Sequence, residues 1–178
     1  MDSAGFSIED QPLPGVYVLN MPRFDDDRGI FLKTFHAKAF ATLGIPFEPA
    51  EQFITCSGLN VLRGMHYQVE EAAHLKLVTC PIGRILDVVV DIRPESDQFN
   101  QPFSIELNSR QPRALLIDKG YAHGFLTIED QSWVQYLTST VHDPDRDRGV
   151  HWASIDFDWP VKTPAISKRD SSHPSIIL

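Results

Sequence analysis

Three side chains that can exchange protons fall on or beside apolar, strand-like segments of this sequence: His66, Lys76 and His123. A histidine titrates near neutrality and can accept a proton. Arg63, three residues before His66, offers a planar cation for phosphate or carboxylate groups. Each residue alone also fits an ordinary strand with a hydrogen-bonded polar side chain. Together with Arg63 and Tyr136 on neighbouring strands, they favour a polar pocket inside a β-barrel.

The residue types suit proton transfer next to a carbonyl group. A histidine removes the proton, a cation stabilises the enolate, and a tyrosine on the opposite face returns a proton with inverted stereochemistry. His66, Lys76 and Tyr136 have the chemistry for these roles. A serine nucleophile is less favoured because the sequence has no GxSxG elbow.

A metal site is not expected. Metal-binding barrels commonly use two histidines separated by one residue, but the position two after His66 is Gln68, a poor ligand for transition metals. His123 alone leaves the ligand set incomplete. We therefore expect no metal.

The composition is that of one soluble domain: 178 residues, 42% hydrophobic, 22% charged, with a formal net charge of -8. The acidic excess disfavours nucleic acid and anionic membranes as partners. Cys56 and Cys80 have no CxxC spacing, which suits a reducing compartment. The first fifteen residues do not resemble a signal peptide, and no apolar run approaches the length of a membrane span. We expect a cytoplasmic protein.

Short strands separated by turns dominate the predicted secondary structure, with one helix at 37–43. Residues 1–14 are expected to be a flexible segment, and 15–178 a single domain with an irregular C-terminal part. Many short strands without a βαβ rhythm predict an antiparallel sandwich or barrel. The strands are expected at 15–19, 30–35, 51–55, 61–67, 75–80, 84–92, 103–108, 113–117, 124–128 and 132–140.

Two aspartates interrupt the apolar run 85–92 and fall on the same side of the predicted strand. A buried carboxylate is costly unless it is paired. We predict that Asp87 anchors a histidine or lysine inside the barrel and that Asp91 occupies a solvated edge. The charged run 143–148 is expected to be a solvated face, and 166–170 a loop that can fold back on the barrel.

The ordered motifs resemble the dTDP-4-dehydrorhamnose 3,5-epimerases, small cupin-like enzymes of nucleotide-sugar metabolism. The resemblance implies an all-β, cupin-type antiparallel jelly roll (double-stranded β-helix) with a few short peripheral helices. It also implies a homodimer whose N-terminal strands contribute across the interface, and no cofactor. The matching residues are 27–31, 61–68, 76–78, 83–93, 119–125, Tyr136, Trp152, 159–160 and 167–170.

The resemblance assigns a role to each matched residue. His66 matches the catalytic base, and Asp170 the carboxylate that pairs with it. Lys76 matches the lysine that stabilises the enolate, and Tyr136 the general acid. The predicted substrate-binding residues are Arg28, Arg63, Gln68, Asp87, His123 and His142.

Three places depart from the family pattern. Lys33 replaces a glutamate, the segment 51–55 lacks an asparagine, and His142 aligns with a tyrosine that helps to hold the nucleotide. The catalytic set is intact. We therefore expect an epimerase of a nucleotide-linked 4-keto-6-deoxyhexose, acting at C5 and also at C3. The alternatives are a single-centre epimerase or ketoisomerase on another nucleotide sugar, and a non-catalytic sugar-binding cupin.

Overall fold

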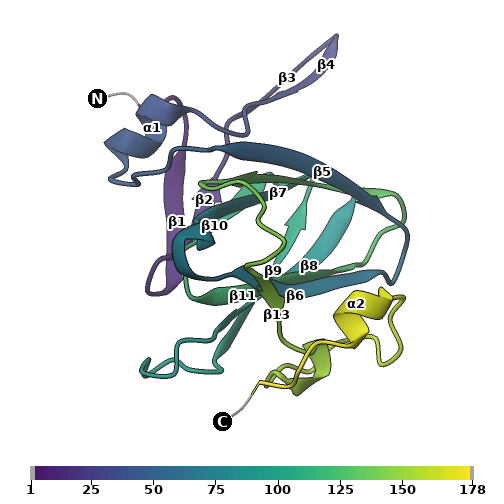
Figure 1. The fold of residues 1–178 in the computed structure, drawn as a ribbon. Helices are drawn as coiled ribbons and strands as arrows, with labels where there is room; N and C mark the ends of the chain where they lie inside the picture. Colours follow the sequence, from purple (N-terminus) through teal and green to yellow (C-terminus); the bar gives the residue numbers. More distant parts are fainter. Residues whose placement is uncertain (1–2, 177–178) are drawn as a thin grey trace.

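The computed structural model describes residues 3–176, and two antiparallel β-sheets form the centre of the domain (Figure 1). The six-stranded sheet has the spatial order β1 (Ser7–Leu13), β2 (Val16–Asn20), β10 (Arg113–Ile117), β7 (Lys76–Ile82), β12 (Ser132–Thr138), β5 (Glu51–Ser57). The five-stranded sheet has the order β13 (Asp147–Gly149), β6 (Leu62–Gln68), β11 (Tyr121–Thr127), β8 (Arg84–Asp91), β9 (Pro102–Asn108).

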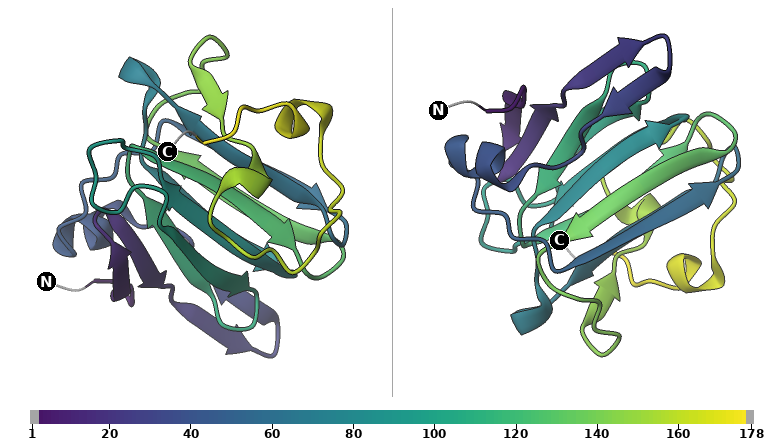
Figure 2. Two further views of the ribbon diagram at one scale, coloured as in Figure 1. Left: turned by 90° about the horizontal axis from the view of Figure 1, so that it is seen from below. Right: turned by 90° about the horizontal axis from the view of Figure 1, so that it is seen from above.

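The remaining elements are short. A hairpin of β3 (Arg23–Asp26) and β4 (Gly29–Leu32) projects away from the sheets (Figures 1 and 2). Helix α1 (Ala37–Thr42) follows it, and α2 (Lys168–Ser171) lies beside β6 in the C-terminal part. Two single 3₁₀ turns span Glu70–Ala72 and Trp152–Ser154. No helix among the residues described is long and apolar enough to cross a membrane.

The apolar residues form three layers, which explains the long apolar runs in the central strands. Val78, Val89 and Phe125 belong to the cluster between the two sheets. A second cluster places α1 and the N-terminal residues on the six-stranded sheet, and a third packs the C-terminal segment around Trp159 on the five-stranded sheet. Strand β8 is therefore covered on both faces, as strands inside a layered domain are.

The predicted antiparallel jelly roll with few short helices is confirmed, and each predicted strand overlaps an observed one. The expectation for residues 1–14 differs from the structure, in which β1 pairs with β2. Most side chains of β1 are exposed. This edge strand is thus held by backbone hydrogen bonds and leaves little apolar pattern in the sequence.

The solvated position predicted for Asp91 is wrong, because its side chain is fully buried. Strand β8 lies inside the sheet between β11 and β9, and Arg93 folds back from the following turn onto the carboxylate. Burial opposes ionisation of Asp91, but hydrogen bonds from Arg93 and Ser96 outweigh it and lower its pKa. The charged partner explains how β8 tolerates a buried carboxylate at its end.

Candidate active site

A cleft between the sheets receives side chains from both of them. It consists of two adjoining cavities of about 680 and 340 Å³, which share Phe53, His66, Lys76 and Arg169. His66 comes from the five-stranded sheet, whereas Lys76 and Phe53 come from the six-stranded sheet. A molecule bound in this cleft would thus face a histidine on one side and a lysine and an aromatic ring on the other.

His66 and Asp170 form a pair at the wall of the larger cavity. His66 Nε2 lies 2.8 Å from Asp170 Oδ1, and the other carboxylate oxygen accepts the Gly64 N–H at 3.1 Å. Asp170 sits in α2, where Ser167 caps the helix by accepting the Asp170 N–H. Burial opposes ionisation of Asp170, but the bonds from His66 and Gly64 outweigh it and hold its pKa at about 2. An ionised Asp170 orients the imidazole and favours its cationic form after it accepts a proton.

Lys76 lines both cavities. The side chain is half-buried, and no hydrogen bond or ion pair to its Nζ is found among residues 3–176. Burial lowers the pKa of Lys76 to about 8, while the charges of Asp87 and Asp147 act in the opposite direction. A partly desolvated cation without a protein partner is suited to stabilise negative charge that develops on a ligand.

Tyr136 lies on the six-stranded sheet and lines the larger cavity with His66. Its ring stacks on Phe53 at 4.6 Å between centroids, and its hydroxyl lies 3.5 Å from Thr55 Oγ1. Burial raises the pKa of Tyr136, so the phenol remains protonated at neutral pH. The group can therefore donate a proton from the wall opposite His66.

The predicted anchoring role of Asp87 is confirmed. Its two carboxylate oxygens each lie 3.0 Å from His123 Nε2, and both side chains are buried. Burial lowers the pKa of His123 although Asp87 opposes the shift. His123 is the register partner of His66 on β6 and lines the larger cavity. Asp87 itself is not among the described residues that line either cavity.

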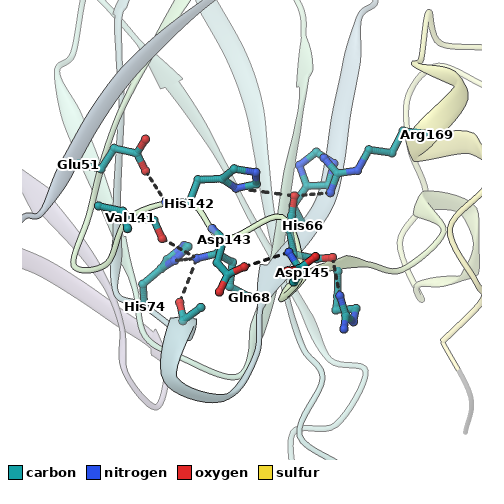
Figure 3. Close-up of polar contacts among 12 residues, drawn as sticks. Glu51, His66, Gln68, His74, Val141, His142, Asp143, Asp145 and Arg169 are labelled. Carbon is teal, nitrogen blue, oxygen red and sulfur yellow. Dashed lines mark hydrogen bonds and ion pairs between the residues drawn. The ribbon is translucent and has the colours of Figure 1, made fainter.

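Gln68 and His142 line the smaller cavity (Figure 3). The Gln68 amide donates to the carbonyls of Ala72 and Val141, and its oxygen accepts the Asp143 N–H at 2.7 Å. Because these bonds occupy the amide, Gln68 supports the loop that carries His142. The main-chain N–H of His142 donates to the carboxylate of Glu51 on β5.

The two predicted arginines lie in different places. Arg63 lines the larger cavity, and its Nε donates to Ser57 Oγ at 2.9 Å. Arg28 lies between β3 and β4, where its side chain is 89% exposed and pairs with Asp26. Arg28 is absent from the residues described as lining either cavity of its own chain. The structure therefore does not bring Arg28 to the other predicted site residues.

Several residues at the cleft were missed by sequence reasoning. Arg169 lines both cavities and forms an ion pair with Asp147, whose side chain is only 13% exposed. The solvated face predicted for 143–148 is thus wrong at Asp147, which belongs to β13. Proximity to Asp170 was an available signal for Arg169. No signal in the sequence pointed to His74. Its ring is mostly buried, and burial and the Lys76 charge lower its pKa to about 3.

Comparisons with known proteins identify relatives with this architecture. The family model described as dTDP-4-dehydrorhamnose 3,5-epimerase matches residues 10–177. A dTDP-4-dehydrorhamnose 3,5-epimerase of Shigella flexneri is 36% identical over 161 residues, covering 89% of each chain. A dTDP-4-dehydrorhamnose 3-epimerase of Streptomyces niveus is 34% identical and covers 89% of this chain and 78% of its own. The crystal structure of the Bacillus anthracis 3,5-epimerase with TDP and PPi bound superposes with a TM-score of 0.92 at 31% identity, covering 96% and 99% of the two chains.

Proposed function

The chain belongs to the dTDP-4-dehydrorhamnose 3,5-epimerase family, and we propose that it epimerises a nucleotide-linked 4-keto-6-deoxyhexose of the dTDP-4-dehydro-6-deoxy-D-glucose type. One observation carries the proposal. The cleft holds a histidine, oriented by a buried carboxylate, on one sheet and a protonated tyrosine on the other, and the Lys76 cation beside them has no partner in the described part of the chain. Binding alone gives no reason for that combination.

The reaction proceeds through an enolate. His66 takes the proton from C5, next to the C4 ketone; the electron pair of the C–H bond forms the C4–C5 double bond, and the carbonyl π pair moves onto the C4 oxygen. Asp170 stabilises the imidazolium, and the Lys76 ammonium stabilises the enolate oxygen. Tyr136 then protonates C5 from the opposite face, and this inverts the centre. The same groups act at C3, which is also adjacent to the ketone.

The charges around the cleft suit a nucleoside diphosphate. Arg63 and Arg169 place two guanidinium groups on it, although the whole chain has a net charge of -8. Guanidinium groups bind phosphate oxygens through paired hydrogen bonds. The smaller cavity, with His142 and Glu51, extends from the shared residues and offers room for the nucleotide. His123, which lies beside His66 and lines the larger cavity, is the side chain that we assign to the sugar.

A single-centre epimerase is the second candidate, since the Streptomyces niveus relative is named a 3-epimerase. The number of solvent deuterons incorporated into the product separates the two. We propose incubating the enzyme with dTDP-4-dehydro-6-deoxy-D-glucose in D₂O and analysing the product by mass spectrometry and NMR. A 3,5-epimerase places deuterium at both C3 and C5, whereas a single-centre enzyme labels one carbon.

The His66→Ala variant tests the base in the same assay. We expect deuterium exchange to fall by about 10²- to 10⁴-fold, the usual contribution of a general base. His36→Ala is the matched control, because His36 caps α1 and does not line the cleft. Exchange in His66→Ala at the control rate would contradict the proposal.

We also propose a cytoplasmic homodimer. The projecting hairpin exposes three large apolar side chains, Phe24 at 58%, Ile30 at 62% and Phe31 at 60%. A second copy that covers them would also bring Arg28, between the two strands, towards a partner. The free cysteines suit a reducing cytoplasm.

A further inference from the structure

A second imidazole, that of His173, lies against the carboxylate that orients the proposed base. His173 Nε2 is 3.8 Å from Asp170 Oδ1, the same oxygen that His66 contacts at 2.8 Å. The two imidazole rings meet edge to face, with centroids 5.7 Å apart. The His173 side chain is 12% exposed, and its buried Nε2 has no hydrogen-bond partner within residues 3–176.

The position of His173 Nε2 is explained by the groups that the two Asp170 carboxylate oxygens already contact. Oδ2 accepts the Gly64 N–H and Oδ1 pairs with His66, so His173 stays just outside hydrogen-bond range. Buried nitrogens without a partner are uncommon in folded proteins. The ring is nevertheless closely accommodated, because a Cβ atom at Gly149 would lie 2.4 Å from His173 Nε2.

We propose that His173 is a positioning residue for His66: neutral His173 leaves Asp170 Oδ1 to His66, and protonated His173 donates to that oxygen and draws it away from the base. The proposal rests on His66 acting as the base. In this arrangement two imidazoles share the Asp170 carboxylate. His66 takes part in the chemistry, and His173 controls the orientation of His66.

Burial favours the neutral state of His173, whereas the charged groups around it act in both directions. His66 on β6 and Arg169 on α2 oppose a positive charge there, whereas Asp170 on α2 and Asp147 on β13 favour one. Burial is the largest effect and lowers the pKa of His173. Protonation of His173 therefore occurs on the acid side of neutrality.

The acid limb of the pH profile of kcat/KM tests the proposal. Two protonations that each remove activity make log kcat/KM fall with a slope approaching two, whereas one gives a slope of one. We expect a limiting slope of two in the wild-type enzyme and of one in His173→Gln and His173→Ala, with KM changed less than about twofold because His173 lines neither cavity. His36→Gln is the control and keeps the slope of two.

NMR titration of the wild-type histidines tests the same coupling if the variants do not fold. We expect the ring signals of His66 and His173 each to show both protonation steps, and this cross-response to disappear in Asp170→Asn. Independent titration of the two rings, a wild-type slope of one, or a slope of two retained in His173→Gln would each overturn the proposal. Failure of His66 as the base would appear separately, as solvent exchange retained in His66→Ala.

Discussion

Asp170 lies 104 residues after His66, yet its carboxylate lies 2.8 Å from the imidazole. A four-residue helix, α2, holds it there, and the Gly64 N–H on β6 binds its second oxygen. The position of one short C-terminal element therefore decides whether His66 is an oriented base or an ordinary histidine.

Replacing Asp170 by Asn tests this dependence. The amide keeps the volume of the side chain but cannot stabilise the imidazolium, so we expect kcat to fall by about 10²- to 10⁴-fold. The rate of epimer formation, followed by NMR, measures the effect, and a thermal melt checks that the variant is folded. A kcat within tenfold of the wild-type value would show that Asp170 does not support the base.

Tyr136→Phe separates proton removal from proton return. His66 can still take a proton, exchange it with solvent and return it to the same face, so deuterium enters the substrate without inversion. We expect epimer formation to fall by about 10²-fold or more while exchange continues. Tyr17→Phe, outside the cleft, is the control. If exchange and epimerisation were lost in parallel, Tyr136 would not be the acid of the second step.

The lowered pKa of Lys76 predicts the basic limb of the pH profile. The ammonium stabilises the enolate only while it is protonated, so raising the pH through about 8 removes that charge and lowers kcat/KM. Lys76→Arg keeps its charge at high pH, and we expect its profile to stay flat to about pH 10, at a lower rate. A basic limb that is unchanged in Lys76→Arg would have to come from another group.

At the scale of elements, β6 and β11 approach closely where the site is built. A Cβ atom on Gly64, which has φ of +133°, would lie 2.5 Å from Gly124 Cα. This contact brings Arg63 and His66 on β6 beside His123 on β11. The glycines thus allow two functional strands to lie nearer than side chains would permit.

The substitution Gly124→Ala measures the importance of this approach. The added methyl group would meet Met65 Sδ at 2.7 Å and the Arg63 carbonyl oxygen at 2.8 Å. We expect the free energy of unfolding to fall by about 1–3 kcal/mol, the usual cost of overpacking, in urea denaturation. In Gly58→Ala the nearest atom is Asp130 Oδ1 at 3.3 Å, which makes it the milder control. Equal stability of the two variants would show that β6 and β11 can separate freely.

At the scale of the whole molecule, the β3–β4 hairpin points away from the sheets and carries Arg28 away from its own cleft (Figure 1). If the protein is a homodimer, Phe31→Glu should weaken it by placing a charge in an apolar interface. Light scattering coupled to gel filtration measures the mass. Ile82→Glu, at an exposed site on β7, is the control. A dimer that persists in Phe31→Glu would place the interface elsewhere.

Complementation tests whether Arg28 acts across such an interface. If each site needs its own His66 and the partner's Arg28, then mixing equal amounts of Arg28→Ala and His66→Ala restores one site in each mixed dimer. Random reassortment should recover about one quarter of wild-type activity. Mixtures no more active than the average of the two separate variants would contradict this arrangement.

The sequence alone predicts the antiparallel architecture and the positions of most strands, because alternating apolar side chains and turn residues act locally along the chain. It also supplied the motif that contains His66 and the prediction that Asp87 anchors a buried partner. The sequence did not predict strand β1, because an exposed edge strand is held by backbone hydrogen bonds and has no apolar pattern. Only the tertiary structure showed that Asp91 is buried and that Arg28 lies outside the cleft of its own chain. It also showed that Asp170 contacts His66 and lies near His173. Those relations depend on packing between distant segments, whose distances no local periodicity records.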